Sequence, residues 1–236
     1  MKQYLVLFLV LAGIVHAESR SVRVFVSLCD NETQGIVPVG EKIGNGDDPE
    51  ANLYWGCTDG ISVHFKKTGK WKVVKTESDV SDAILRRIHF KHVEEDLVLV
   101  ADAYRGSKMM LCLKDFETAA ASGEYDLVAY IGHNALMDFR QEPPTKVDGN
   151  RTEVVVLCCL SEKYFRKRLE ALGCRPLVMT SQFMYPGSFI LASATESWRK
   201  GGGHEGARAA AGLAYAKNQK ISVKAATGVF SDLGNE

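Results

Sequence analysis

The sequence predicts an α/β protein with three layers, a mainly parallel sheet covered by helices on both faces. Short apolar runs alternate along the chain with segments of helical periodicity, and this alternation is typical of parallel strands joined by helices. Two of the runs, residues 126–131 and 153–158, are apolar at nearly every position, as expected of strands buried on both faces. The length of 236 residues suits one domain of this kind.

The first half of the chain divides into short elements around one long loop. Residues 22–28 open the domain as a strand, because Val, Phe and Leu alternate there with small or polar residues. Glycines and prolines in residues 30–52 predict a long loop, which in a compact domain is usually functional or disordered. Further strands are expected at 71–74 and 97–101, and helices at 59–67, 79–92 and 109–122.

The second half carries the two most apolar strands and most of the predicted helix. A polar loop, residues 140–152, separates the two strands. After the second strand, residues 161–172 form an amphipathic helix, with Ser161 as the expected N-cap and Gly173 as the stop. One more strand and two helices follow, at 177–180, 187–200 and 205–217.

The amino terminus reads as a targeting signal. Lys2 is followed by an apolar stretch, residues 5–15, and then by Val15-His16-Ala17, a small-residue cleavage pattern. The stretch is too short to span a bilayer comfortably, and no later run is long enough to do so. We therefore expect residues 1–17 to be a signal peptide and residues 18–236 to be a single exported domain, periplasmic or secreted, with no stable membrane span.

Charge and cysteine content limit the kinds of partner and cofactor that we expect for this protein. Acidic and basic residues number 29 each, so the field expected of a nucleic-acid-binding protein is missing from the sequence. No Cys-X-X-Cys motif and no zinc-ligand spacing occur, and we expect neither a metal nor another cofactor. Export permits disulfides, and Cys29 with Cys57 is the first pair to test.

The ends of two predicted strands carry the side chains best suited to catalysis, a histidine and a cysteine. One apolar run breaks at Gly132-His133-Asn134, and the other breaks at Cys158-Cys159. Catalytic groups collect at the carboxyl ends of strands in open α/β sheets, and 26 residues suffice for a crossover between parallel neighbours. His133 and Cys159 could then form a thiolate–imidazolium pair. A lone cysteine in such a place is more often a small buried hydrophobe, so the alternative interpretation stays open.

These motifs resemble those of the caspase-like cysteine peptidases, which include caspases, gingipains, clostripain, legumains and bacterial CHAT-domain peptidases. Gly132-His133-Asn134 resembles the Gly-His element of that family, and residues 154–159 resemble the strand that leads to its nucleophile. The resemblance implies a divergent bacterial member in which His133 is the general acid/base and Cys159 the nucleophile, with Cys158 as the alternate nucleophile. It also implies that the backbone N–H groups of Asn134 and Cys159 bind the oxyanion.

The resulting expectation is an exported peptidase that cleaves peptides or proteins through a Cys-His dyad. Substrate specificity would come from polar residues at neighbouring strand ends. Asp30 or Asp102 would suit a basic substrate residue, Arg105 an acidic one, and Gln182 is a further candidate. The alternative is a catalytically inactive caspase-like domain that binds a peptide or an envelope component. The sequence leaves the oligomeric state open.

Overall fold

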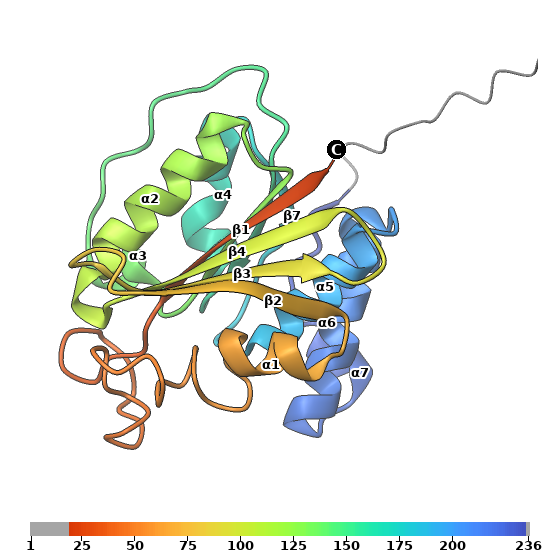
Figure 1. The fold of residues 1–236 in the computed structure, drawn as a ribbon. Coiled ribbons are helices and arrows are strands. Elements are labelled where there is room, and N and C mark those ends of the chain that lie inside the picture. Colours follow the sequence, from red (N-terminus) through yellow and green to blue (C-terminus); the bar gives the residue numbers. More distant parts are fainter. Residues whose placement is uncertain (1–18, 235–236) are drawn as a thin grey trace, which may run out of the picture.

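A mixed sheet of seven strands forms the centre of the molecule in a computed structural model, which describes residues 19–234 (Figure 1). The strand order is β2-β3-β4-β1-β5-β6-β7. The strands are β1 (Arg20–Ser27), β2 (Trp71–Ser78), β3 (Ile84–His92), β4 (Leu97–Tyr104), β5 (Leu127–Ile131), β6 (Glu153–Leu157) and β7 (Arg175–Val178). The five strands from β4 to β7 run parallel, whereas β2 and β3 form an antiparallel extension at one edge.

Helices cover both faces of the sheet, which confirms the predicted three-layer α/β class. They are α1 (Ile61–Lys67), the short 3-10 helix η1 (Gly106–Lys108), α2 (Met109–Ser122), α3 (Ala135–Asp138), α4 (Ser161–Ala171), α5 (Ser188–Trp198), α6 (Gly203–Gln219) and α7 (Val223–Thr227). Figure 1 shows α2, α3 and α4 on one face and α1, α5, α6 and α7 on the other. Strand β5 contributes to both cores: Val128 and Tyr130 pack with the first group, and Ala129 and Ile131 with the second.

One predicted element is wrong. Residues 79–92 were expected to be helical from the spacing of Ile84, Leu85 and Ile88, but residues 84–92 form strand β3. The strand pairs antiparallel with both β2 and β4, and a register shift between Ile84 and Arg86 inserts an extra residue. This bulge interrupts the period of two, so buried positions near it are three residues apart and imitate a helix.

The other boundaries differ less from the predictions. The strand expected at 71–74 extends to Ser78, and the long loop after β1 contains no helix or strand before α1 begins at Ile61. All six cysteines lie in the described residues and are free thiols, so the structure does not form the Cys29–Cys57 disulfide that we selected for testing. The proposed signal peptide falls outside the described residues. Among residues 19–234, none of the helices has the length and apolar character needed to cross a bilayer.

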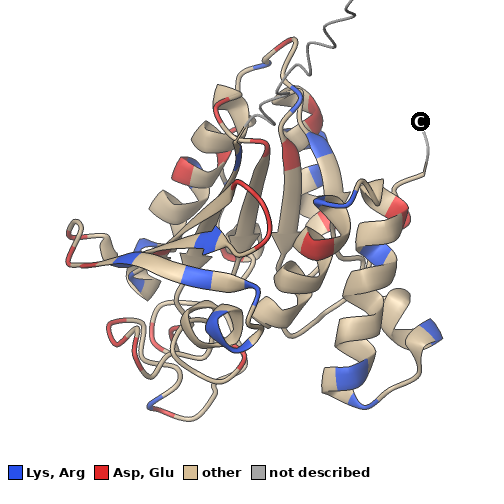
Figure 2. Ribbon diagram, turned by 45° about the vertical axis from the view of Figure 1, so that its right-hand side comes forward, with Lys and Arg blue, Asp and Glu red and all other residues tan. Residues whose placement is uncertain are grey.

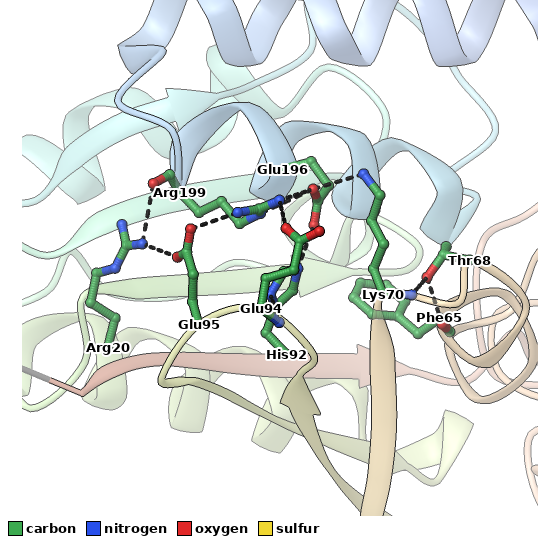
Figure 3. Close-up of polar contacts among 9 residues, drawn as sticks. All are labelled: Arg20, Phe65, Thr68, Lys70, His92, Glu94, Glu95, Glu196 and Arg199. Atoms are coloured by element: carbon green, nitrogen blue, oxygen red, sulfur yellow. Dashed lines mark hydrogen bonds and ion pairs between the residues drawn. The ribbon is translucent and has the colours of Figure 1, made fainter. Parts of the chain in front are cut away.

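The amino edge of the parallel strands is held by an ion-pair network (Figure 3). Arg199 is 8% exposed and pairs with Glu94, Glu95 and Glu196 at 3.0, 2.6 and 2.9 Å. Arg20, at the start of β1, pairs with Glu95 at 2.6 Å and donates to the backbone oxygen of Arg199 at 3.1 Å. These charges are matched within the fold, so we interpret this edge as structural.

Candidate active site

Strands β5 and β6 bring the two predicted motifs to the same edge of the sheet. The strands are parallel neighbours, and Ile131 pairs with Leu157 at the last position of each. The Gly132 N–H then donates to the Leu157 oxygen at 3.2 Å. Because both strands end at this level, His133 and Cys159 lie just beyond adjacent strand ends.

Gly132 allows the chain to turn out of the sheet beside β1. Its φ of +151° lies in a region that L side chains rarely adopt. A Cβ at this position would lie 2.9 Å from the Ser27 backbone oxygen and 3.0 Å from the Ser27 Cβ. The backbone at Gly132 therefore approaches β1 more closely than a side chain would allow.

Asn134 joins the two strand ends. Its Nδ2 donates to the Cys159 backbone oxygen at 2.7 Å, and its Oδ1 accepts from the Leu136 N–H at 3.1 Å, which makes it the N-cap of α3. Its backbone is extended and not left-handed, with a φ of −79° and a ψ of 95°. The residue is fully buried and acts through its side chain.

The His133 ring has a carboxylate partner that the sequence analysis missed. His133 Nε2 lies 2.9 Å from Asp138 Oδ2, at the end of α3, and Asp138 also accepts from the Gly35 N–H at 2.8 Å. The His133 ring is 7% exposed, and its backbone oxygen accepts from the Tyr130 hydroxyl at 2.8 Å. The contact with Asp138 holds the ring in one orientation through Nε2. An aspartate five residues after the histidine was the available signal.

The Cys159 thiol is half-buried and contacts the loop that follows β7. The Met184 N–H donates to Cys159 Sγ at 3.4 Å, and the Met184 oxygen lies 3.5 Å from the same sulfur. These two contacts hold the sulfur against the Met184 backbone. The neighbouring Cys158 is fully buried, and burial raises the pKa of its thiol well above the usual value. Cys159 is thus the accessible thiol of the pair.

The backbone between β6 and α4 has an unusual conformation directly after Cys159. Leu160 has a φ of +53°, a left-handed conformation that costs about 1–2 kcal/mol for such a residue. Leu160, not Ser161, occupies the N-cap position of α4, so the predicted cap is wrong; the Ser161 hydroxyl donates instead to the Val156 oxygen at 2.9 Å. Strained backbone of this kind clusters at functional sites.

Several backbone N–H groups at the two strand ends make no hydrogen bond in the described part of the chain. Within residues 19–234, neither the Asn134 N–H nor the Cys159 N–H donates a hydrogen bond. The next two N–H groups are occupied: Leu160 donates to the Gln182 oxygen at 3.0 Å, and Ser161 donates to Thr180 Oγ1 at 3.1 Å. The N–H groups of the two residues predicted to bind an oxyanion thus have no acceptor here, and neither do those of His133 and Cys158; Asn134 itself is fully buried.

The ring and the thiol do not contact each other through a hydrogen bond in the part of the chain that the structure describes. His133 Nε2 is directed to Asp138, and the Cys159 sulfur is directed to Met184. Catalytic hydrogen bonds are often long before substrate binds and tighten in the complex. The structure therefore brings the two strand ends together without joining the two reactive groups.

Two of the predicted specificity residues, Asp30 and Asp102, are buried and paired within the fold. Asp102 is fully buried, and Arg87 donates to its two carboxylate oxygens at 2.6 and 2.7 Å while Arg23 pairs with it from β1. Asp30 is 8% exposed, and its carboxylate accepts from the Glu32 N–H at 3.0 Å and from Thr33 Oγ1 at 2.6 Å. Both carboxylates have partners already.

The other two predicted specificity residues also have partners. Arg105 pairs with Asp47 and donates to the Asp82 backbone oxygen at 3.1 Å. Gln182 is exposed, and its Nε2 donates to the Gly228 oxygen at 3.1 Å. These contacts stabilise the loops that surround the carboxyl edge of the sheet.

The loop after β1 is acidic and lies next to the His133 partner. Residues 30–59 contain seven acidic residues and one basic residue, and Figure 2 shows the acidic segments in the loops below the sheet. Gly35 of this loop contacts Asp138. The described residues contain no group of three or more His, Cys, Asp or Glu side chains placed to hold a metal ion.

Comparison with known proteins adds no relative: no family model, no curated protein and no solved structure matches this chain.

Proposed function

We propose that this chain is a caspase-like cysteine peptidase, with Cys159 as nucleophile and His133 as general acid/base, that acts outside the cytoplasm after export directed by residues 1–17. The observation that carries the proposal is the connection between the two strand ends. The Asn134 side chain, next to His133, donates to the Cys159 backbone oxygen at 2.7 Å. Histidine and cysteine in this relation are the parts of an acyl-transfer site.

In the proposed reaction, the Cys159 thiolate attacks the carbonyl carbon of the scissile peptide bond. The carbonyl oxygen becomes an oxyanion, and its proposed donors are the N–H groups of Asn134 and Cys159, which make no hydrogen bond within residues 19–234. The protonated His133 ring then gives a proton to the leaving amine, and the peptide C–N bond breaks. Water, deprotonated by His133, hydrolyses the remaining thioester and restores the thiolate.

Asp138 supports this role for His133. A carboxylate 2.9 Å from Nε2 fixes the orientation of the ring. The Gly35 N–H in turn holds the carboxylate from the acidic loop. Cys159, His133 and Asp138 together have the order of nucleophile, base and orienting group that hydrolases of several folds share.

A second candidate function is a catalytically inactive caspase-like domain that binds a peptide or an envelope component in the same place. The observation that favours it is the missing hydrogen bond between the His133 ring and the Cys159 thiol among the described residues. The two candidates differ in one measurable property, the reactivity of Cys159.

Alkylation with iodoacetamide at pH 7 separates the two candidates, because the fold limits the competing thiols. Four of the six cysteines are buried: Cys29, Cys112, Cys158 and Cys174. Burial raises the pKa of Cys29 to about 11. Cys57 is half-buried like Cys159, but burial raises the pKa of its thiol. Cys57 therefore serves as the internal control.

The peptidase proposal predicts that Cys159 reacts about tenfold or more faster than Cys57, since a free thiol is only a few per cent thiolate at neutral pH. His133→Ala should slow the alkylation of Cys159 about tenfold and leave that of Cys57 unchanged. His89→Ala is the matched control, because His89 lies on β3, three strands from β5, and should leave the rate unchanged. Equal, slow alkylation of Cys57 and Cys159 in the wild-type protein would support the inactive binding domain instead.

A further inference from the structure

The two exposed phenylalanines of the described residues both flank the candidate active site. Phe139 directly follows Asp138 and is 45% exposed, and Phe183 directly precedes Met184 and is 70% exposed. The remaining phenylalanines between residues 19 and 234 are buried. Aromatic side chains, Phe included, are enriched at binding surfaces, whereas single exposed aliphatic side chains are ordinary on a protein surface.

Two aliphatic side chains extend this surface. Met137 is 36% exposed in α3, and Val37 is 87% exposed in the loop after β1, two residues beyond Gly35. The Gly35 N–H contacts Asp138, so this loop lies against the His133 side of the site. Val37, Met137, Phe139 and Phe183 are called the apolar rim below.

The polar groups around the site are less available than the apolar rim. Asp102 is fully buried between two arginines, and Asp30 accepts hydrogen bonds from its own loop. Arg105 pairs with Asp47, and Gln182 donates to the Gly228 oxygen. A charged substrate side chain would have to displace these contacts, whereas the rim offers uncovered apolar surface at no such cost.

We propose that the apolar rim binds the substrate residues on both sides of the scissile bond, so that the preferred substrate is a peptide with apolar side chains there. This inference rests on the proposed peptidase function. Phe183 contributes from the Cys159 side of the site, through the Met184 segment. Phe139 and Met137 contribute from the His133 side, through α3.

The test is peptide binding to the full exported domain carrying Cys159→Ala, so that no peptide is cleaved during the measurement. Fluorescein-labelled peptides that differ only in their two central residues, Leu-Phe, Lys-Lys or Asp-Asp, are titrated by fluorescence anisotropy. The Leu-Phe peptide should bind about tenfold more tightly than either charged peptide. Phe183→Ala and Phe139→Ala should each weaken its binding about tenfold, as truncation of aromatic anchors does.

Leu213→Ala is the matched control, because Leu213 is 61% exposed on α6, on the other face of the sheet from α3, and should not change the affinity. Tighter binding of the Lys-Lys peptide would overturn the inference in favour of the acidic loop. Absence of binding, or affinities that Phe183→Ala and Phe139→Ala leave unchanged, would overturn it as well. Binding of the Leu-Phe peptide by a chain whose Cys159 shows no enhanced alkylation would refute the peptidase while supporting the rim.

Discussion

Replacing Asn134 by alanine tests whether this side chain holds the candidate site together. The substitution removes the N-cap of α3, where Asn134 Oδ1 accepts from the Leu136 N–H, at about 1 kcal/mol. It also removes the donor to the Cys159 oxygen at 2.7 Å, and a carbonyl left without its partner costs about 1–2 kcal/mol when it is partly buried. We therefore expect the free energy of unfolding to fall by about 2–3 kcal/mol.

Asn134→Ser separates the two contributions. Serine is an equally good N-cap but is too short to replace the amide that reaches Cys159. This variant should therefore lose about 1–2 kcal/mol, the part that belongs to the strand-end contact. Urea unfolding followed by circular dichroism gives both values, provided that the slope with denaturant stays constant across the three proteins.

We expect the free energy of unfolding to be highest for the wild type, lower for Asn134→Ser and lowest for Asn134→Ala. A loss below about 0.5 kcal/mol in Asn134→Ala, the range of an ordinary surface substitution, would show that the contact contributes nothing. Equal stability of Asn134→Ser and the wild type would show that Asn134 stabilises the fold only as the N-cap of α3. In that case the observation that carries the proposed function would lose its energetic basis.

Two other perturbations test the two edges of the sheet. Gly132→Ala should lower the free energy of unfolding by about 1–3 kcal/mol more than Gly123→Ala does. Both glycines have positive φ, but only a Cβ at Gly132 would lie against β1. Thermal melting of the two variants compares the losses, and equal losses would contradict the close approach. Burial alone would raise the pKa of Glu196, but hydrogen bonds from Arg199 and Lys70 outweigh it and lower the pKa to about 2. The stability that Glu196 contributes should be complete above about pH 4.5 and be lost as the pH falls toward 2, a dependence that acid titration of Glu196→Gln should no longer show.

The buried parallel strands and several helices could be predicted because local pattern and tertiary environment agree there. Residues 127–131 and 154–157 are apolar on both faces, as central strands require, and they lie in β5 and β6. The helix expected at 109–122 has those bounds, and Gly123 follows it with a φ of +71°. The order of these strands also placed the two motifs at one edge correctly.

Strand β3 could not be predicted from periodicity because its bulge changes the spacing of buried positions. Leu85 and Ile88 are three residues apart, and only from Ile88 onward do buried residues recur at every second position, through Phe90 to His92. Pairing with β2 and β4 decides the conformation, and the sequence of residues 84–92 alone does not reveal that pairing. Tertiary pairing overrides the local signal here.

The candidate site was predictable in its position and less so in its connections. Strand order brought Cys159 beside Asn134, but the hydrogen bond between them depends on a side-chain rotamer that no spacing predicts. Asp138 lies on a helix of four residues, too short to leave a periodic pattern. Asp102 was predicted as a specificity residue because it lies near a strand end, although its side chain is buried between arginines.

The two edges of the sheet differ in a way that bears on function. At the amino edge, a buried arginine and its neighbours form a network in which the charges are matched. At the carboxyl edge, Leu160 has left-handed backbone, two N–H groups have no acceptor among the described residues, and Phe183 is exposed. Each of these features is unfavourable for stability alone. Departures of this kind also occur elsewhere, since Asp79 and Lys220 have positive φ, but those beside Cys159 lie where we propose the site.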